Sequence, residues 1–165
     1  MDQLSDDEFQ VSDVITDGSH MQDGKLRPNV TYLAGEFDYK YETDTNGRIK
    51  TWTTNNLQLT SRKDRLKHNP NTPGKKGGDH AGHLAADMFG GSSDIDNLVS
   101  QHGKKVNWSG YRKHENEWKK ALQADPPKIV EINLSIDYSD DDSRPVKFKL
   151  EYFIDGDRYY VEIDN

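Results

Sequence analysis

The middle of the sequence reads Asp79-His80-Ala81-Gly82-His83-Leu84, and Asn107-Trp108-Ser109-Gly110-Tyr111-Arg112-Lys113-His114-Glu115 comes shortly after it. The first segment is typical of a short strand and turn, and the second runs from a loop into a helix. Together they supply an imidazole, a neutral amide and a carboxylate. An imidazole, with an ordinary pKa of about 6.5, can take a proton from water near neutral pH. An amide oxygen is a hard ligand that suits Mg²⁺, and a carboxylate can organise the water shell of the ion. Taken in this order, the three groups point to hydrolysis of nucleic acid with a single metal ion.

Patterns on either side of these segments predict an α+β fold with an antiparallel β-sheet. Residues 37–42 alternate aromatic and charged side chains, and Asn46-Gly47 favours a tight hairpin into a returning strand over residues 49–59. A helix is expected from Ser109 to Leu122, ended by Pro126-Pro127. Alternation returns in the C-terminal part and predicts three more strands, over residues 129–136, 146–154 and 159–163.

Composition limits the class of protein. The chain has 165 residues, of which 32% are hydrophobic, so we expect one domain with a modest core. It holds no cysteine, which excludes disulfides, thiolate metal sites and cysteine nucleophiles. No segment approaches the ~20 apolar residues that span a membrane, so no membrane partner is expected. No signal peptide is visible either, and any export signal is expected on sequence outside this chain.

The net charge of −7 is distributed unevenly along the chain. Residues 1–44 hold 3 Lys and Arg against 11 Asp and Glu, and residues 124–165 hold 5 against 11. Residues 45–123 hold 14 against 7 and contain every candidate site residue. A locally positive region is what binding to a polyanion requires, although solvated charged faces would give the same totals.

The acidic segment of residues 1–26 has little apolar periodicity. It includes Gly18-Ser19-His20-Met21, a tetrapeptide that often marks a cloning junction. We therefore interpret residues 1–26 as a linker or as vector-derived sequence, and expect the folded domain over residues 27–165.

Several residues resemble the DNA/RNA non-specific endonucleases of the ββα-metal (His-Me finger) superfamily, particularly the nuclease domains of secreted bacterial toxins exported by type VII systems. The Gly82-His83 pair corresponds to the end of the first strand of that motif, and Asn97-Leu98 to its second strand. Asn107 corresponds to the asparagine at the start of the following helix, and Glu115 to a glutamate two turns further on. The resemblance covers the chain from about residue 28 to its end, and it implies a ββα-metal core.

The resemblance also implies a role for each of these residues. His83 would be the general base, Asn107 the protein ligand to one Mg²⁺ ion, with Mn²⁺ as an alternative ion, and Glu115 the organiser of the water around that ion. Gly82 would allow close backbone approach. Asp79 and Asn97 would support the site structurally.

The sequence departs from the usual Asp-Arg-Gly-His form of the family, because Ala81 replaces the arginine that faces the phosphate. Toxin-type members share the Ala-Gly-His form, so we do not interpret the change as loss of activity. It leaves the binding of the phosphate unassigned, and five cations of the basic region are candidates: Arg62, Arg65, Lys104, Lys105 and Arg112.

The function expected is a magnesium-dependent endonuclease that cuts DNA, with RNA as a further substrate, without regard to base sequence. The resemblance further implies a toxin domain of a secreted antibacterial effector that acts in the cytoplasm of the target cell and is neutralised by an immunity protein. The alternative is a catalytically inactive, nuclease-like module that binds nucleic acid or a protein. A scavenging nuclease would use the same chemistry.

Overall fold

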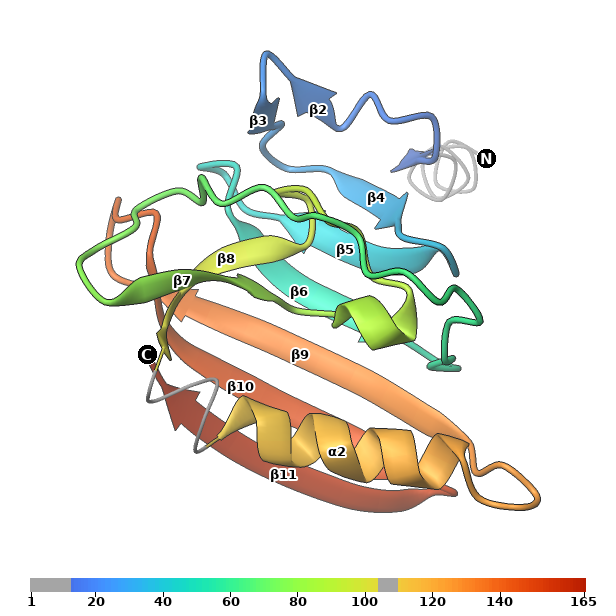
Figure 1. Cartoon of the computed structure of the whole chain (residues 1–165). Helices are drawn as coiled ribbons and strands as arrows, with labels where there is room; N and C mark the ends of the chain where they lie inside the picture. The colour runs from blue at the N-terminus through green and yellow to red at the C-terminus, as the bar shows by residue number, and fades with distance from the viewer. Residues whose placement is uncertain (1–12, 104–109) are drawn as a thin grey trace, which may run out of the picture.

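The computed structural model describes residues 13–103 and 110–165. Its largest element is a seven-stranded sheet in the order β1-β4-β5-β6-β9-β10-β11 (Figure 1). All neighbours are antiparallel except β1 and β4, which are parallel. The strands are β1 (Val14–Ile15), β4 (Thr31–Ala34), β5 (Tyr39–Thr43), β6 (Ile49–Thr54), β9 (Val130–Tyr138), β10 (Pro145–Ile154) and β11 (Asp157–Asp164). The mostly antiparallel sheet expected from the alternating patterns is therefore present.

A second layer covers one face of this sheet. It consists of the antiparallel pair β7 (Asp79–His83) and β8 (Leu98–His102), the short 3-10 helix η1 (Asp87–Phe89) and the helix α2 (Tyr111–Leu122). In Figure 1, α2 lies across β9 to β11, and β7 with β8 lies across β5 and β6. The described residues thus form mostly sheet with one α-helix, which is not long and apolar enough to cross a membrane.

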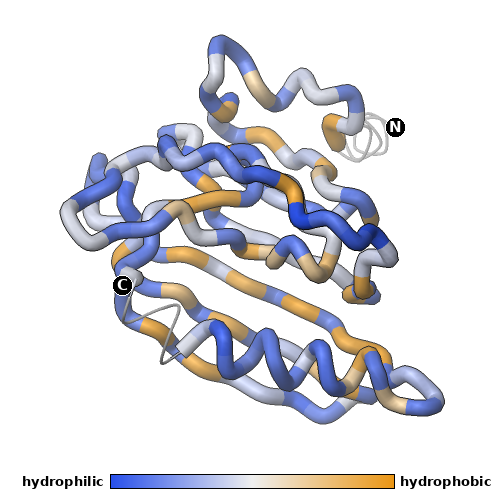
Figure 2. The backbone as a smooth tube through the Cα atoms, viewed as in Figure 1, coloured by the Kyte–Doolittle hydropathy of each residue, from blue (hydrophilic) through white to orange (hydrophobic). Residues whose placement is uncertain are grey.

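Apolar residues concentrate on the strands, whereas α2 and the long loop of residues 61–78 carry mostly polar ones (Figure 2). The loop has no helix or strand, as expected from its Asn, Pro and Gly content. The strand expected over residues 49–59 ends at Thr54, although the backbone N–H of Leu57 still bonds the carbonyl of Val130.

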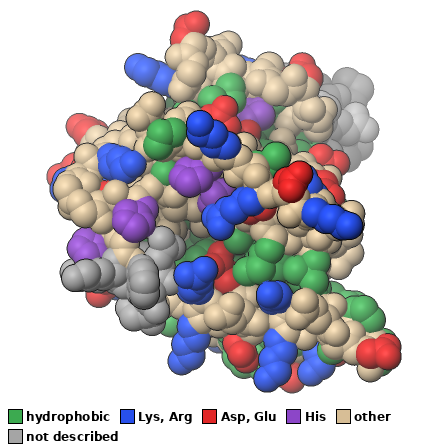
Figure 3. All heavy atoms as spheres, in the orientation of Figure 1, with side chains coloured by type: hydrophobic (Ala, Val, Ile, Leu, Met, Phe, Trp, Pro, Cys, Tyr) green, Lys and Arg blue, Asp and Glu red, His purple; other side chains and the backbone are tan. Residues whose placement is uncertain are grey.

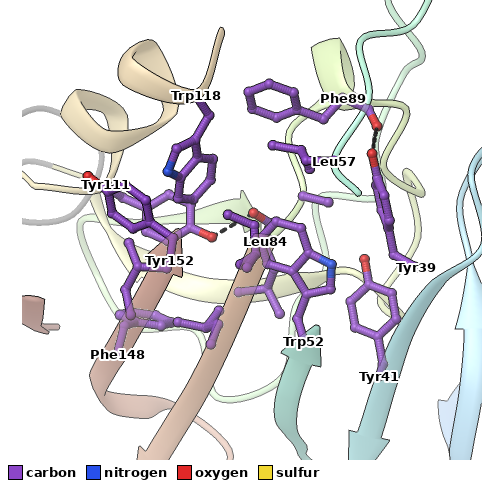
Figure 4. Close-up of a cluster of buried hydrophobic side chains, with 14 of the residues drawn as sticks. Tyr39, Tyr41, Trp52, Leu57, Leu84, Phe89, Tyr111, Trp118, Phe148 and Tyr152 are labelled. Carbon is purple, nitrogen blue, oxygen red and sulfur yellow. Dashed lines mark hydrogen bonds between the residues drawn. The ribbon is translucent and has the colours of Figure 1, made fainter. Parts of the chain in front are cut away.

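The core between the layers is dominated by aromatic rings (Figure 4). Trp118 of α2 packs edge-on against Trp52 of β6 and Tyr152 of β10, with ring centroids 6.3 and 5.4 Å apart. The hydroxyl of Tyr111 donates a hydrogen bond of 2.7 Å to the carbonyl of Leu84, the residue directly after β7. This bond fixes the start of α2 beside the end of β7.

Residues 13–26 depart from the expectation that the fold starts at residue 27. They carry β1, β2 (Met21–Gln22) and β3 (Lys25–Leu26), and β1 extends the main sheet by pairing with β4. His20 is buried, stacks on Tyr32 with ring centroids 4.2 Å apart, and contacts the carboxylate of Asp96 at 3.0 Å. Packing of this kind is not expected of a cloning remnant, and the local composition gave no sign of it because β4, Tyr32 and Asp96 lie elsewhere in the chain.

Candidate active site

A cleft of about 700 Å³ opens between β7, the loop of residues 61–78, η1 and α2. Figure 3 shows histidine side chains gathered beside a hollow, with basic side chains around it. His83, at the end of β7, and Glu115, on α2, both line this cleft. The Tyr111–Leu84 hydrogen bond explains why strand and helix meet here, although 32 positions separate the two residues in the sequence. Histidine and glutamate are thus brought to one site.

His83 is partly buried, and its Nε2 atom is enclosed without a hydrogen-bond partner among the described residues. Burial lowers the pKa of His83 to about 4, with further lowering by His68 and Arg65 and an opposing effect of Asp87. The imidazole is therefore neutral at physiological pH. A neutral ring is the form that can accept a proton from water.

Glu115 lies one turn into α2 and has no hydrogen-bond or ion-pair partner in the described part of the chain. Burial raises the pKa of its carboxyl to about 8, and Arg112 and Arg65 act in the opposite direction. Burial disfavours the ionised form of this carboxyl group. A cation bound beside it would stabilise that form.

The residues of the cleft fit a metal ion that keeps most of its water. No group of three His, Asp or Glu side chains that could enclose an ion occurs among the described residues. Mg²⁺ does not need such a group, because it commonly binds through one or two protein oxygens plus water and phosphate. The Glu115 carboxyl, short of a counter-charge, is consistent with such an ion nearby. Asn107, the expected ligand, lies outside the described residues, between β8 and α2.

Gly82 leaves room for a neighbouring side chain, and it is not needed for a turn. A Cβ atom at this position would overlap the side-chain amide of Gln101, which is buried on β8. Any larger residue would have to displace the Gln101 side chain next to His83. The close neighbour of Gly82 among the described residues is thus a side chain of β8.

Asp79 lies at the far end of β7 from His83 and faces Arg144. Its carboxylate accepts hydrogen bonds from Arg144 Nε at 2.7 Å and Nη2 at 2.9 Å, and from the backbone N–H of Lys76 at 2.8 Å. The hydrogen bond from Arg144 is the main reason why the pKa of Asp79 is lowered. These contacts join β7 to the turn before β10.

Asn97 lies directly before β8 and is fully buried. Its side-chain oxygen accepts hydrogen bonds from Tyr41 at 2.6 Å and from the N–H of Ala85 at 2.9 Å. Its amide nitrogen donates to the carbonyls of Ala85 and Ser92, both at 2.8 Å. Asn97 therefore closes the connection between β7 and β8 and holds the residues that follow His83.

The structure separates the cationic candidates. Arg65 and Arg112 line the cleft with His83, and neither forms an ion pair within the described part of the chain. Arg62 instead pairs with Asp87 at 3.1 Å and lines a different groove, together with Glu36, Leu66 and residues 90–93. Lys104 and Lys105 lie outside the described residues.

The sequence gave no indication of two further side chains in the cleft, His68 and Lys75. Both come from the loop of residues 61–78, which has neither periodicity nor a motif. Only its tertiary contacts bring it over β7. A histidine within a basic loop was the one available signal, and such a signal is too common to identify a site.

Comparison with known proteins places this geometry in a family. Residues 28–156 match the family described as DNA/RNA non-specific endonuclease. The chain belongs to this family. It is therefore a nuclease, a hydrolase of phosphodiester bonds, in a family of metal-dependent enzymes.

Curated relatives come from a secretion system. Type VII secretion system protein EssD of Staphylococcus aureus, in strains USA300 and NCTC 8325, is 37% identical over 151 residues. The matched region is 86% of this chain but only 24% of the relative. The chain thus spans about a quarter of the length of the curated relatives that it matches.

Solved structures share the fold. NucA from Streptococcus agalactiae with magnesium ion bound superposes with a TM-score of 0.64 and 20% identity, covering 85% of this chain and 74% of NucA. NucA with no metal bound gives a TM-score of 0.62 and 20% identity, covering 77% and 70%. At this identity, the likeness shows a common fold.

Proposed function

We propose that this chain is a magnesium-dependent endonuclease domain that cuts DNA, and RNA as a further substrate, without base specificity. The observation that carries the proposal is the meeting of His83 and Glu115 in one cleft with two cations that have no ion-pair partner in the described part of the chain, Arg65 and Arg112. We assign β7, β8 and α2 to the ββα-metal core of the superfamily on the order of these elements and the Tyr111–Leu84 bond.

His83 would act as the general base. Its Nε2 atom is buried, so we assign acceptance of the proton to Nδ1. The neutral ring takes a proton from the water that attacks phosphorus, and a base of this kind contributes about 10²–10⁴-fold to the rate. The imidazole keeps this proton, a bond forms from the water oxygen to phosphorus, and the bond from phosphorus to the leaving oxygen breaks. The leaving oxygen takes a proton from solvent water.

Asn107 would hold the Mg²⁺ ion through its side-chain oxygen, and Glu115 would orient the water around the ion. When bound, Mg²⁺ offsets the negative charge that develops on the phosphate and on the leaving oxygen. Arg65 and Arg112 would bind the non-bridging oxygens and the neighbouring phosphates. Contacts with phosphate carry no sequence information, so cutting should be indifferent to base sequence.

The biological role that we propose is that of a toxin domain in a longer secreted effector. It rests on the relation to EssD, a protein of a type VII secretion system. Such a nuclease would act in the cytoplasm of the target cell, and the producing cell would need an immunity protein. We expect that partner to cover the basic cleft around Arg65 and Arg112, because an acidic surface can replace phosphate there.

Cleavage of supercoiled plasmid separates this proposal from a nuclease-like binding module without catalysis. We expect nicking and linearisation with Mg²⁺, none with excess EDTA, and recovery when Mg²⁺ or Mn²⁺ is restored. His83→Ala should remove cleavage while binding of the plasmid persists. A purified protein that binds DNA but never cuts it in Mg²⁺ would favour the inactive module.

A further inference from the structure

A second imidazole faces His83 in the cleft. The ring of His68 lies 5.5 Å from the ring of His83, centroid to centroid, at an interplanar angle of 69°. This is an edge-to-face contact, the arrangement that aromatic pairs prefer. Both rings line the same cleft, and His68 is partly buried.

The loop that carries His68 is tied to the β7–β8 unit on both sides of the histidine. Before it, the N–H of Leu66 contacts the carboxylate of Asp87 at 3.3 Å. Directly after it, the N–H of Asn69 donates to the carbonyl of Ser93 at 2.9 Å. Further on, the hydroxyl of Thr72 bonds that of Ser100 at 2.7 Å. A loop without regular structure is thus held in one position over β7, and its histidine is held with it.

The His83 ring lacks the contact that usually fixes a catalytic histidine. In most such sites one ring nitrogen is held by a carboxylate or a backbone carbonyl, which sets the tautomer and the orientation of the ring. Nε2 of His83 has no such partner among the described residues. Within the described part of the chain, packing rather than a hydrogen bond orients the ring, and the aromatic ring in contact with it is that of His68.

We propose that His68 is the positioning residue of the catalytic base: its ring holds the His83 imidazole with one nitrogen directed into the cleft. The inference rests on the proposed function, because it matters only if His83 removes the proton.

His68 also has an electrostatic effect on its neighbour. Charged side chains line the cleft with His83 from each surrounding element: Arg65 and Lys75 from the loop, Asp79 from β7, Asp87 from η1, and Arg112 and Glu115 from α2. After burial, the charge of His68 is the largest influence that lowers the pKa of His83. Replacing His68 with a neutral ring should therefore move the acidic limb of the pH–rate profile to higher pH.

The test compares His68→Ala and His68→Phe with the wild-type protein in Mg²⁺, on a fluorogenic oligonucleotide at fixed ionic strength. We expect His68→Ala to lower kcat about tenfold or more with little change in KM, because a misoriented base impairs the reaction and leaves binding intact. His68→Phe should restore most of kcat, since it keeps a ring at the contact. Leu66→Ala is the control on the same loop, because the Leu66 side chain is exposed and does not line this cleft. It should retain kcat within about twofold.

A second readout needs neither metal nor substrate. Titration of the His83 ring by NMR in the metal-free protein should give a higher pKa in His68→Phe than in the wild type, which also keeps the proposal testable if His68→Ala does not fold. The proposal is overturned if His68→Ala matches the wild type, if it changes KM alone, if His68→Phe is as impaired as His68→Ala, or if the His83 pKa does not move. Activity that survived in His83→Ala would instead overturn the proposed function.

Discussion

The two ends of the cleft place a carboxyl group in opposite environments. At one end, Asp79 is held by Arg144 and by the backbone of Lys76, and its pKa is lowered. At the other end, Glu115 has no partner in the described part of the chain, and burial raises its pKa to about 8. The first carboxylate is used for stability. The second is kept in an unfavourable environment, as a group reserved for a cation or for catalysis commonly is.

The same contrast applies to the arginines. Arg62 is neutralised by Asp87, whereas Arg65 lies in the cleft without an ion pair in the described part of the chain. Residues at the paired positions should therefore affect folding, and those at the unpaired positions should affect the reaction. Each of the following variants tests that division.

The largest effect is expected at His83. His83→Ala should lower kcat by about 10²–10⁴-fold, the usual contribution of a general base, with KM nearly unchanged. The measurement is initial rate against substrate concentration in saturating Mg²⁺, with circular dichroism to check folding. A loss confined to KM would show that His83 binds the substrate instead.

Asp79→Ala should act on stability. The side chains of Asp79 and Arg144 are only 1% and 11% exposed, so removing one partner leaves a nearly buried charge unpaired. Such a change costs about 3–5 kcal/mol of unfolding free energy. Urea denaturation at pH 7 measures it, and kcat per folded molecule, determined at low temperature, should stay close to that of the wild type. A loss of kcat in a folded Asp79→Ala variant would show that Asp79 contributes to the reaction and not only to stability.

Glu115→Gln should have opposite effects on the two properties. The folded-state pKa of Glu115, about 8, lies above the ordinary value of 4.5. Between these values the unfolded chain loses the proton first, so the wild-type protein becomes less stable as pH rises from 4.5 to 8. Gln resembles the protonated form and should remove this loss, giving about 4 kcal/mol of added stability at pH 8 in EDTA and little at pH 4.

The same variant should lose activity in Mg²⁺ at every pH. Urea denaturation in EDTA at pH 4 and pH 8 measures the stability, and plasmid cleavage in Mg²⁺ measures the activity. If Glu115→Gln neither stabilised the metal-free protein nor lowered activity, the interpretation of Glu115 as a buried carboxyl group kept for function would be wrong.

The smallest effect separates the two arginines. Arg65→Ala should raise KM about fivefold, as expected for one phosphate contact, and should reduce the salt dependence of binding. Arg62→Ala should change KM less and should lower stability slightly, because Asp87 then lacks its partner. Measuring KM of both variants at several salt concentrations tests whether the two arginines differ in this way. Equal effects of the two variants on KM would show that both arginines face the substrate.

The pattern of residues by itself indicated helix α2 and most strands of the main sheet, and it made His83 and Glu115 candidates for the site. Alternation over six to ten residues is a local property, and it predicted β5, β9, β10 and β11 before any contact was known. Local patterns placed His83 on a strand and Glu115 on a helix, and the resemblance to the family linked the two residues.

Tertiary structure alone decided the environment of those side chains. Asp79 and Arg144 are 65 positions apart, and His20 and Asp96 are 76 apart, so no local pattern indicates that they pair. His68 reaches His83 only because its loop is bonded to β8 and to the β7–β8 connection. The raised pKa of Glu115 likewise follows from burial. Burial and pairing are properties of the packed chain, and they exist only once segments distant in sequence are brought together.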